Sequence, residues 1–348
     1  MRQTFFNVLT AHAAAYPKME ACDYVKLAYQ CEFGCGHLLT DREAAYRMLL
    51  EEWEHTPVDV LEPLTVDIGG GYARLNLAAA KRCMSAELVF AMFEKSVAPG
   101  GSREGFLRKV HNISRAASMG ILPCSGDDVL SYAASLGDGM PSHSSCYRHL
   151  YGANYRVVST EMATIAPICM LLSDAMKKAE RINIAIDGCA ASGKSTVARL
   201  LGELFDGTVI SMDDYFLPVT KKTAERLAMP GGNVDYERLK AELTSERYAD
   251  RLVHSRFDCQ KQTLLPPKVE ERRAVLLIEG VYSLHPDLRD FYDISILLQT
   301  DQESQRLRIL ERDGDALWHR YEAEWIPLEE AYFNATQPAL FADFTVRT

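Results

Sequence analysis

Residues 182–196 read Ile-Asn-Ile-Ala-Ile-Asp-Gly-Cys-Ala-Ala-Ser-Gly-Lys-Ser-Thr, and they are the strongest indication of fold in the chain. An apolar run typical of a buried parallel strand leads into the pattern GxxxxGKS, and a helix-forming run, 196–204, follows directly. In this order of strand, glycine-rich loop and helix, successive loop amides point at one anion, and the helix start adds its positive dipole end. The stretch therefore predicts a phosphate-binding P-loop.

The predicted loop contains both a phosphate cradle and a metal ligand. Lys194 can reach the β- and γ-phosphates of a nucleotide, and the Ser195 hydroxyl can ligate Mg²⁺. The predicted cofactors are therefore ATP and Mg²⁺, and the alternative is a structural glycine turn. The residues expected to contact the nucleotide are Gly188, Ala190, Ala191, Ser192, Gly193, Lys194, Ser195 and Thr196.

The bulk composition is that of a globular protein. A length of 348 residues suggests two domains. The formal net charge of −10 argues against a nucleic-acid-binding surface, and no apolar run approaches the ~20 residues that span a bilayer. Nine cysteines, an odd number scattered along the chain, indicate reduced thiols in a cytoplasmic protein. We expect a small-molecule substrate as partner and no nucleic acid or membrane, and a homodimer stays open.

The two halves of the chain have different patterns. Residues 1–178 predict a helix-rich α+β domain with a β-hairpin, 64–68 and 72–77, around Gly69-Gly70-Gly71. Thr40 to Glu43 matches a capping box at the start of a helix that runs to Glu54. Residues 179–348 alternate strands and helices, which predicts an α/β domain with a parallel sheet flanked by helices. The expected strands are 182–186, 208–211, 274–278, 294–298 and 344–346.

Acidic residues follow two of these strands. In a parallel α/β sheet, ligands bind beyond the carboxyl ends of the strands. Asp213 and Asp214 follow the second strand, and an acid there can orient an acceptor hydroxyl or hold Mg²⁺; the alternative is a helix cap. Glu279 follows the third strand, where it would bind Mg²⁺ unless it simply faces solvent. We take Asp213 as the catalytic acid and Glu279 as the metal residue.

Arginines follow the fourth strand. Arg306, Arg308 and Arg312 fall in one predicted helix, and Arg308 and Arg312 share a face because they are four residues apart. Such arginines can close over the phosphates and stabilise transition-state charge. The alternative is a solvated face that pairs with Glu303 or Glu311.

With these pieces in order, the chain from residue 182 onward resembles the uridine kinase/phosphoribulokinase family of P-loop small-molecule kinases. The resemblance covers about half of the chain. It is carried by segments 187–196, 211–216, 232–235, 256–258, 278–286 and 306–313.

The resemblance implies phosphoryl transfer from ATP to a hydroxyl of a small molecule. It assigns Lys194, Arg308 and Arg312 to the phosphates and makes Asp213 the catalytic acid. It also implies an acceptor site in which Asp235 holds sugar hydroxyls, Phe257 packs against a base and Phe216 stands nearby.

The acceptor-reading positions depart from the family pattern. Uridine kinases usually carry Tyr where Phe216 stands and His near Gln262, and residues 233–235 lack the usual Phe and the following His-Pro. Asp235 could instead cap a helix, and Phe257 could belong to the core. Phosphoryl transfer is therefore better supported than uridine as acceptor.

Two clusters in the first half have ligand chemistry. Cys31, Cys35 and His37 lie close in sequence, and His143 lies in a second group with Cys146 and His149. They could form a Zn²⁺ site, or Glu32, His37 and His143 could form a second ligand site. Buried thiols and a glycine loop are the simpler interpretation, because the spacing is not that of a zinc finger.

The sequence predicts a small-molecule kinase that phosphorylates a nucleoside or a similar hydroxyl-bearing metabolite. Two alternatives stay open. The chain could be an ATP-binding regulatory or assembly module whose output comes from the first domain, or a bifunctional enzyme with a second site there.

Overall fold

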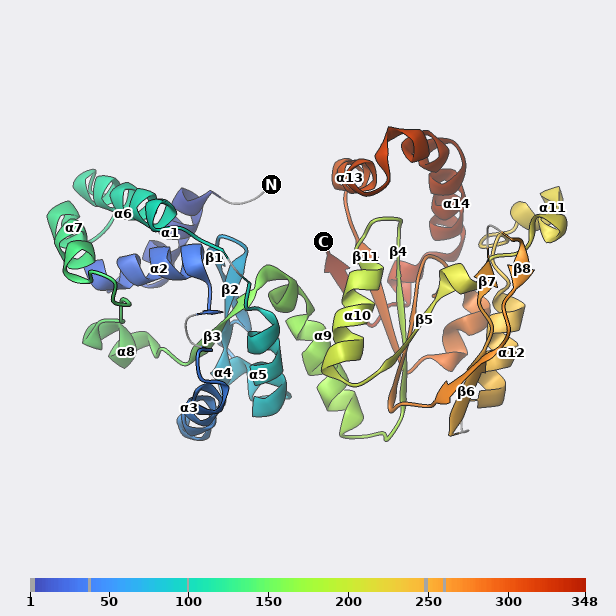
Figure 1. Cartoon of the computed structure of the whole chain (residues 1–348), viewed down its shortest axis with the longest axis horizontal. Helices are drawn as coiled ribbons and strands as arrows, with labels where there is room; N and C mark the ends of the chain where they lie inside the picture. The colour runs from blue at the N-terminus through green and yellow to red at the C-terminus, as the bar shows by residue number, and fades with distance from the viewer. Residues whose placement is uncertain (1–3, 37–38, 99, 247–249, 259–260) are drawn as a thin grey trace. The chain divides into compact units, whose positions relative to one another are not determined.

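The computed structural model describes residues 4–36, 39–98, 100–246, 250–258 and 261–348. It divides the chain into two compact units, residues 1–174 and 175–348 (Figure 1). None of the helices in these ranges is long and apolar enough to cross a membrane.

Unit 1 is built mainly from helices around a small antiparallel sheet. The sheet has the order β1-β2-β3, and the hairpin turns at Gly69-Gly70-Gly71 as predicted. Its elements are α1 (Phe5–Ala15), α2 (Ala21–Phe33), α3 (Arg42–His55), β1 (Thr65–Gly69), β2 (Tyr72–Asn76), α4 (Leu77–Ala80), α5 (Ala86–Lys95), α6 (Arg103–Ser118), α7 (Gly126–Ser135), α8 (Ser145–Tyr151), β3 (Tyr155–Ser159) and α9 (Thr160–Met176).

The start of α3 differs from the predicted capping box. Asp41 is the N-cap, and its carboxylate accepts a hydrogen bond from the Ala44 amide at 3.0 Å. Because the cap lies one residue later than expected, Glu43 stands in the first turn rather than at the position that would close the box.

Unit 2 contains a five-stranded parallel sheet in the order β12-β11-β4-β10-β5. Strand β4 is central and every one of its residues is buried, as expected where helices cover both faces of a sheet. Helix α10 packs on β4, β5 and β10. The predicted P-loop-type parallel sheet is confirmed.

The strands of the sheet are connected by helices and by one long excursion between β5 and β10. The elements of unit 2 are β4 (Ile182–Gly188), α10 (Lys194–Leu204), β5 (Thr208–Ser211), η2 (Met212–Tyr215), η3 (Val219–Lys221), α11 (Ala224–Leu227), α12 (Tyr236–Glu246), β6 (Arg251–His254), β7 (Phe257–Asp258), β8 (Thr263–Leu264), β9 (Lys268–Glu271), β10 (Val275–Glu279), η4 (Pro286–Phe291), β11 (Ile294–Gln299), α13 (Gln302–Arg320), η5 (Tyr321–Trp325), α14 (Ile326–Thr336), η6 (Pro338–Leu340) and β12 (Phe344–Arg347).

Helices α13 and α14 stand beyond the carboxyl ends of the strands (Figure 1). Helix α13 is interrupted at Gly314, which has a φ of 75° and a ψ of 174°. A residue with these angles leaves the helical path, and glycine adopts them at low steric cost. The predicted arginines therefore lie in the part of α13 that precedes this break.

Candidate functional site

The loop between β4 and α10 has the geometry of a phosphate cradle. Gly188 has a φ of 149°, and a Cβ atom there would lie 2.4 Å from the carbonyl oxygen of Leu298. Gly193 is the N-cap of α10 in a left-handed conformation, φ 93°. Both positions require glycine, because a side chain would strain the backbone or collide with the neighbouring strand. The loop amides and the start of α10 can therefore converge on an anion.

Lys194 and Ser195 begin α10 beside Glu279. The Lys194 ammonium donates to the Cys189 carbonyl at 2.8 Å, so it bends back over the loop. The Ser195 hydroxyl donates to the Glu279 carboxylate at 3.1 Å. Burial raises the pKa of Glu279, while the Lys194 charge opposes that shift. A hydroxyl and a carboxylate side by side are the oxygen ligands that Mg²⁺ prefers, so this pair fits the metal.

The two acids after β5 have different surroundings. Asp213 is solvent-accessible but closely surrounded by protein, which raises its pKa, and the charges of Lys194 and Arg312 act in the opposite direction. The carboxylate of Asp214 is bound by Arg256, Nε to Oδ1 at 2.9 Å. Of the two acids, Asp213 is the one within electrostatic reach of the P-loop lysine.

Asp187, at the end of β4, has a structural role that sequence reasoning missed. Its buried carboxylate accepts hydrogen bonds from the Tyr332 hydroxyl at 2.7 Å and from the Leu284 amide at 2.9 Å. It also accepts one from the Gly188 amide at 2.6 Å. Asp187 therefore ties the P-loop to α14 and to the segment after β10. Its position at a strand end was the signal that could have identified it.

Glu329 of α14 is a second acid that the sequence did not reveal. Its carboxylate accepts a hydrogen bond from the Ala190 amide of the P-loop at 2.9 Å. Burial raises its pKa to about 7. Gln305 of α13 donates to the carbonyl of the same Ala190 at 3.2 Å. Helices α14 and α13 thus bind the amide and the carbonyl of Ala190, respectively. Both partners lie more than a hundred residues from Ala190 in the sequence, so no local pattern encodes these contacts.

The predicted arginines occupy different places around the loop. Arg308 donates to the Ala191 carbonyl and to the Thr348 hydroxyl, both at 3.2 Å. Arg312 is exposed and bonds to Asp313 and to the Tyr321 hydroxyl. Arg306 is exposed and lies over the Trp318 ring. Arg308 thus reaches the loop itself, and Arg312 comes close enough to Asp213 to lower its pKa.

The residues predicted to read the acceptor lie in the excursion after β5. Asp235 accepts a hydrogen bond from the Arg238 amide at 3.1 Å, the geometry of a cap on α12. Phe257 is buried in β7, and Phe216 is partly buried and packs on the core cluster of this unit. Asp235 still has an accessible side chain, so capping and ligand contact are compatible.

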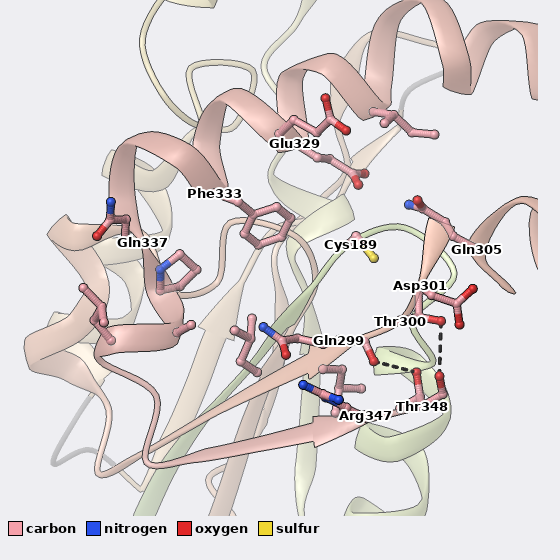
Figure 2. Close-up of a pocket in the computed structure, with 17 residues that line it drawn as sticks. Cys189, Gln299, Thr300, Asp301, Gln305, Glu329, Phe333, Gln337, Arg347 and Thr348 are labelled. Carbon is pink, nitrogen blue, oxygen red and sulfur yellow. Dashed lines mark hydrogen bonds between the residues drawn. The ribbon is translucent and has the colours of Figure 1, made fainter. Parts of the chain in front are cut away.

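A cavity of about 820 Å³ opens beside the P-loop (Figure 2). Figure 2 shows Glu329 and Phe333 of α14 on one side and, on the other, Gln299 at the end of β11 with Thr300 and Asp301 after it. Cys189 forms part of the lining at the edge of the loop. The cavity therefore adjoins the loop and has an aromatic ring in its wall.

The cysteine and histidine clusters of unit 1 do not come together as a metal site among the described residues, which hold no suitable group of His, Cys, Asp and Glu. Cys31 and Cys35 are buried free thiols. His143 bonds to Asp23 and Tyr155, whereas Glu32 bonds to Lys109 and Ser102. His37 lies outside the described residues.

The sheet order, the loop and its lysine define unit 2 as a P-loop fold. The solved structures to which the chain is similar include several named as small-molecule kinases, and each of them matches about half of this chain. A possible uridine kinase from Bacillus stearothermophilus has 21% identity and a TM-score of 0.41, over 53% of this chain and 97% of that one.

Two further similar structures are also kinases. D-glycerate 3-kinase from Cryptococcus neoformans has 13% identity and a TM-score of 0.34, over 44% of this chain and 79% of that one. Shikimate kinase from Acinetobacter baumannii, in complex with shikimate, has 19% identity and a TM-score of 0.31, over 50% and 87%. No protein-family model and no curated protein matches the chain.

Proposed function

We propose that unit 2 transfers the γ-phosphoryl group of ATP to a hydroxyl of a small metabolite. The single observation that carries the proposal is the convergence of Lys194, Ser195, Asp213 and Glu279 at one edge of the sheet. Ser195 and Glu279 are hydrogen-bonded, and the Lys194 charge acts on both acids. A cation for phosphate, oxygen ligands for a metal and a separate acid for an acceptor are the groups that phosphoryl transfer needs.

Each group has a distinct role in this proposal. The amides of residues 191–195 bind the β-phosphate, and Lys194 neutralises the charge of the transferred group. Ser195 and Glu279 hold Mg²⁺, which when bound supplies charge neutralisation of the phosphates. Arg312, close to Asp213, adds positive charge on the acceptor side, while Arg308 holds the Ala191 carbonyl and so supports the loop.

Asp213 orients the acceptor hydroxyl and accepts its proton. Its pKa is raised by burial and held down by Lys194 and Arg312, and such a balance keeps a carboxylate available as a base. The cavity beside the loop, with the Phe333 ring in its wall, is suited to the nucleoside part of ATP. Asp235 and Phe257 stay the candidates for acceptor contacts, and a nucleoside or similar polyol is the proposed acceptor class.

The experiment is ADP release from the full chain with Mg²⁺, ATP and a panel of nucleosides, sugars and vitamins. One panel member should stimulate release, and Asp213→Asn should reduce kcat by roughly 10²-fold or more with ATP affinity unchanged. Asp214→Asn is the matched control, because that neighbouring carboxylate is already bound by Arg256; its kcat should fall less than roughly tenfold.

The outcomes separate this proposal from its alternatives. If the chain binds ATP but no acceptor stimulates ADP release, a regulatory nucleotide-binding module replaces the kinase. If Asp213→Asn and Asp214→Asn behave alike, the assignment of Asp213 is wrong.

A further inference from the structure

Unit 1 contains a buried arginine whose charge no carboxylate balances directly. Arg74 of β2 is 3% exposed. Its Nε and one terminal nitrogen donate to the Gln30 side-chain oxygen at 3.1 and 2.8 Å, and the other terminal nitrogen donates to the Tyr147 hydroxyl at 2.9 Å. These three bonds use only part of the guanidinium's five N–H donors.

A buried acid of the same hydrogen-bond network, Asp23, is otherwise engaged. Asp23 is fully buried, and one of its oxygens accepts from the His143 ring at 2.7 Å and from the Ser144 amide at 3.0 Å. The other oxygen accepts from the Ser144 hydroxyl at 2.7 Å and from the Glu20 amide at 2.9 Å. In the part of the chain that the structure describes, Arg74 therefore forms no ion pair.

One further group, Lys26, adds to the positive charge. Lys26 is partly buried, and burial together with the charges of Arg74 and Arg148 lowers its pKa. Its ammonium donates only to the Pro141 carbonyl among the described contacts, at 3.3 Å. Two cations in this position are costly in a protein interior unless an anion joins them.

Aromatic rings account for only part of the compensation. The Arg74 guanidinium lies 4.5 Å from the Tyr155 ring centroid and 6.0 Å from that of Tyr147. Such contacts stabilise a cation by about 1 kcal/mol each, which is less than a partner anion provides. They leave the two remaining N–H donors of the guanidinium for the oxygens of a ligand.

A hydrogen-bonded chain fixes the groups around this arginine. Burial lowers the pKa of His143 to about 4, so the ring is neutral. With its Nδ1–H donated to Asp23, its Nε2 accepts from the Tyr155 hydroxyl at 2.6 Å. Gln30 donates to the same hydroxyl at 3.0 Å. The side chains beside Arg74 are thus held rigidly, as in a preorganised ligand site.

Some residues beside Arg74 are partly accessible to solvent. Arg74 itself is buried, but Lys26, Tyr16 and Tyr155 are half-buried and adjoin it.

We propose that Lys26, Gln30, Arg74, His143, Tyr147 and Tyr155, together the Arg74 cluster, form a second ligand site, which binds the carboxylate or phosphate group of a small molecule. The anion completes the unused donors of Arg74 and pairs with Lys26. This site is independent of the P-loop and of the proposed kinase activity.

The test is calorimetric titration of the full chain with inorganic phosphate and, separately, with acetate, at constant ionic strength. All variants carry Lys194→Ala, so that phosphate is not drawn to the P-loop. One of the two anions should bind once per chain, and which of them binds distinguishes a phosphate ligand from a carboxylate ligand. Arg74→Lys, which keeps the charge but loses the fork, should weaken binding roughly tenfold or more.

Lys26→Met is a second variant, and it tests the proposed anion site if Arg74→Lys fails to fold. It should weaken binding roughly tenfold as well. Arg108→Met is the control, because Arg108 is exposed and pairs with Glu104 in the same helix; its titration should match the parent. Absence of binding by both anions, or binding unchanged by Arg74→Lys and Lys26→Met, overturns the proposal.

Discussion

The P-loop edge of unit 2 and the Arg74 cluster of unit 1 both gather buried charge, but of opposite sign. Around Lys194 stand Asp213, Glu279 and Glu329. The surrounding protein raises the pKa of all three acids, and Glu279 and Glu329 are buried. The Arg74 cluster instead combines a buried guanidinium with Lys26 and a neutral histidine.

The difference indicates which ligand each region lacks. Buried charge of one sign is stable only with a partner of the other sign. Acids around one lysine suit a metal cation that arrives with phosphates, whereas a buried cation that forms no ion pair with a carboxylate suits an anion alone. The same physical rule thus leads to two different ligands in one chain.

The largest expected effect concerns Lys194, the cation of the P-loop edge. Lys194→Ala should reduce acceptor-dependent ADP release about 10³-fold, because the charge of the transferred group loses its counter-charge. Lys240→Ala, at an exposed lysine of α12, is the control and should retain the parent rate. Equal rates in Lys194→Ala and the parent would contradict the role of the loop.

Glu329 should make the stability of unit 2 depend on pH. The pKa of Glu329 is about 7 in the folded state, against an ordinary value of 4.5. Between these two pH values the folded state binds a proton that the unfolded state does not. Unit 2 therefore loses stability as pH rises through that window. Glu329→Gln should therefore gain up to about 3 kcal/mol at about pH 8 and little at about pH 4.

Urea unfolding of this variant is followed by Trp318 and Trp325 fluorescence in a Trp53→Phe background, so that only unit 2 reports. If the stability difference between Glu329→Gln and the parent does not change with pH, the assigned pKa shift is refuted.

His12 should give the opposite slope in unit 1. Burial lowers its pKa to about 4 from 6.5, so the unfolded state binds the proton between these values and stability falls as pH drops through that window. His12→Gln, which can still donate to the Asp67 carbonyl, should remove this loss of stability, which is about 2 kcal/mol at about pH 5. Trp53 fluorescence in a Trp318→Phe, Trp325→Phe background reports on unit 1, and parallel slopes in the parent and His12→Gln would be inconsistent with a neutral buried His12.

The smallest expected effect separates two neighbouring residues in unit 1. Asp41→Ala should destabilise unit 1 by about 1 kcal/mol, because it removes the cap on α3. Thr40→Ala should change stability by only a few tenths of a kcal/mol, roughly the size of an ordinary surface substitution. The reverse order in urea unfolding would restore the capping box predicted from the sequence.

The fold of unit 2 could be predicted because its signals are local. An apolar strand, a glycine loop and a helix follow one another within residues 182–204, and acids at strand ends can be placed by the rule for parallel sheets. The contacts of Glu329 and Asp187 could not be predicted, because α14 reaches the loop from the far end of the unit.

In unit 1, less of the structure could be predicted from the sequence. Its hairpin and the helix that runs to Glu54 were predictable from turn residues and a capping pattern. The Arg74 cluster was not, because it joins α2, β2, α8 and β3, which are separated by long stretches of chain. His143 was singled out from the sequence for metal chemistry, whereas the structure pairs it with Asp23 and Tyr155.

The most direct test of the central claim is a crystal structure of the full chain with Mg²⁺ and a non-hydrolysable ATP analogue. We expect the β-phosphate on the amides that precede and begin α10, the metal beside Ser195 and Glu279, and the base in the cavity at Phe333. An analogue bound elsewhere, or a loop whose amides stay empty at saturating nucleotide, would contradict the account.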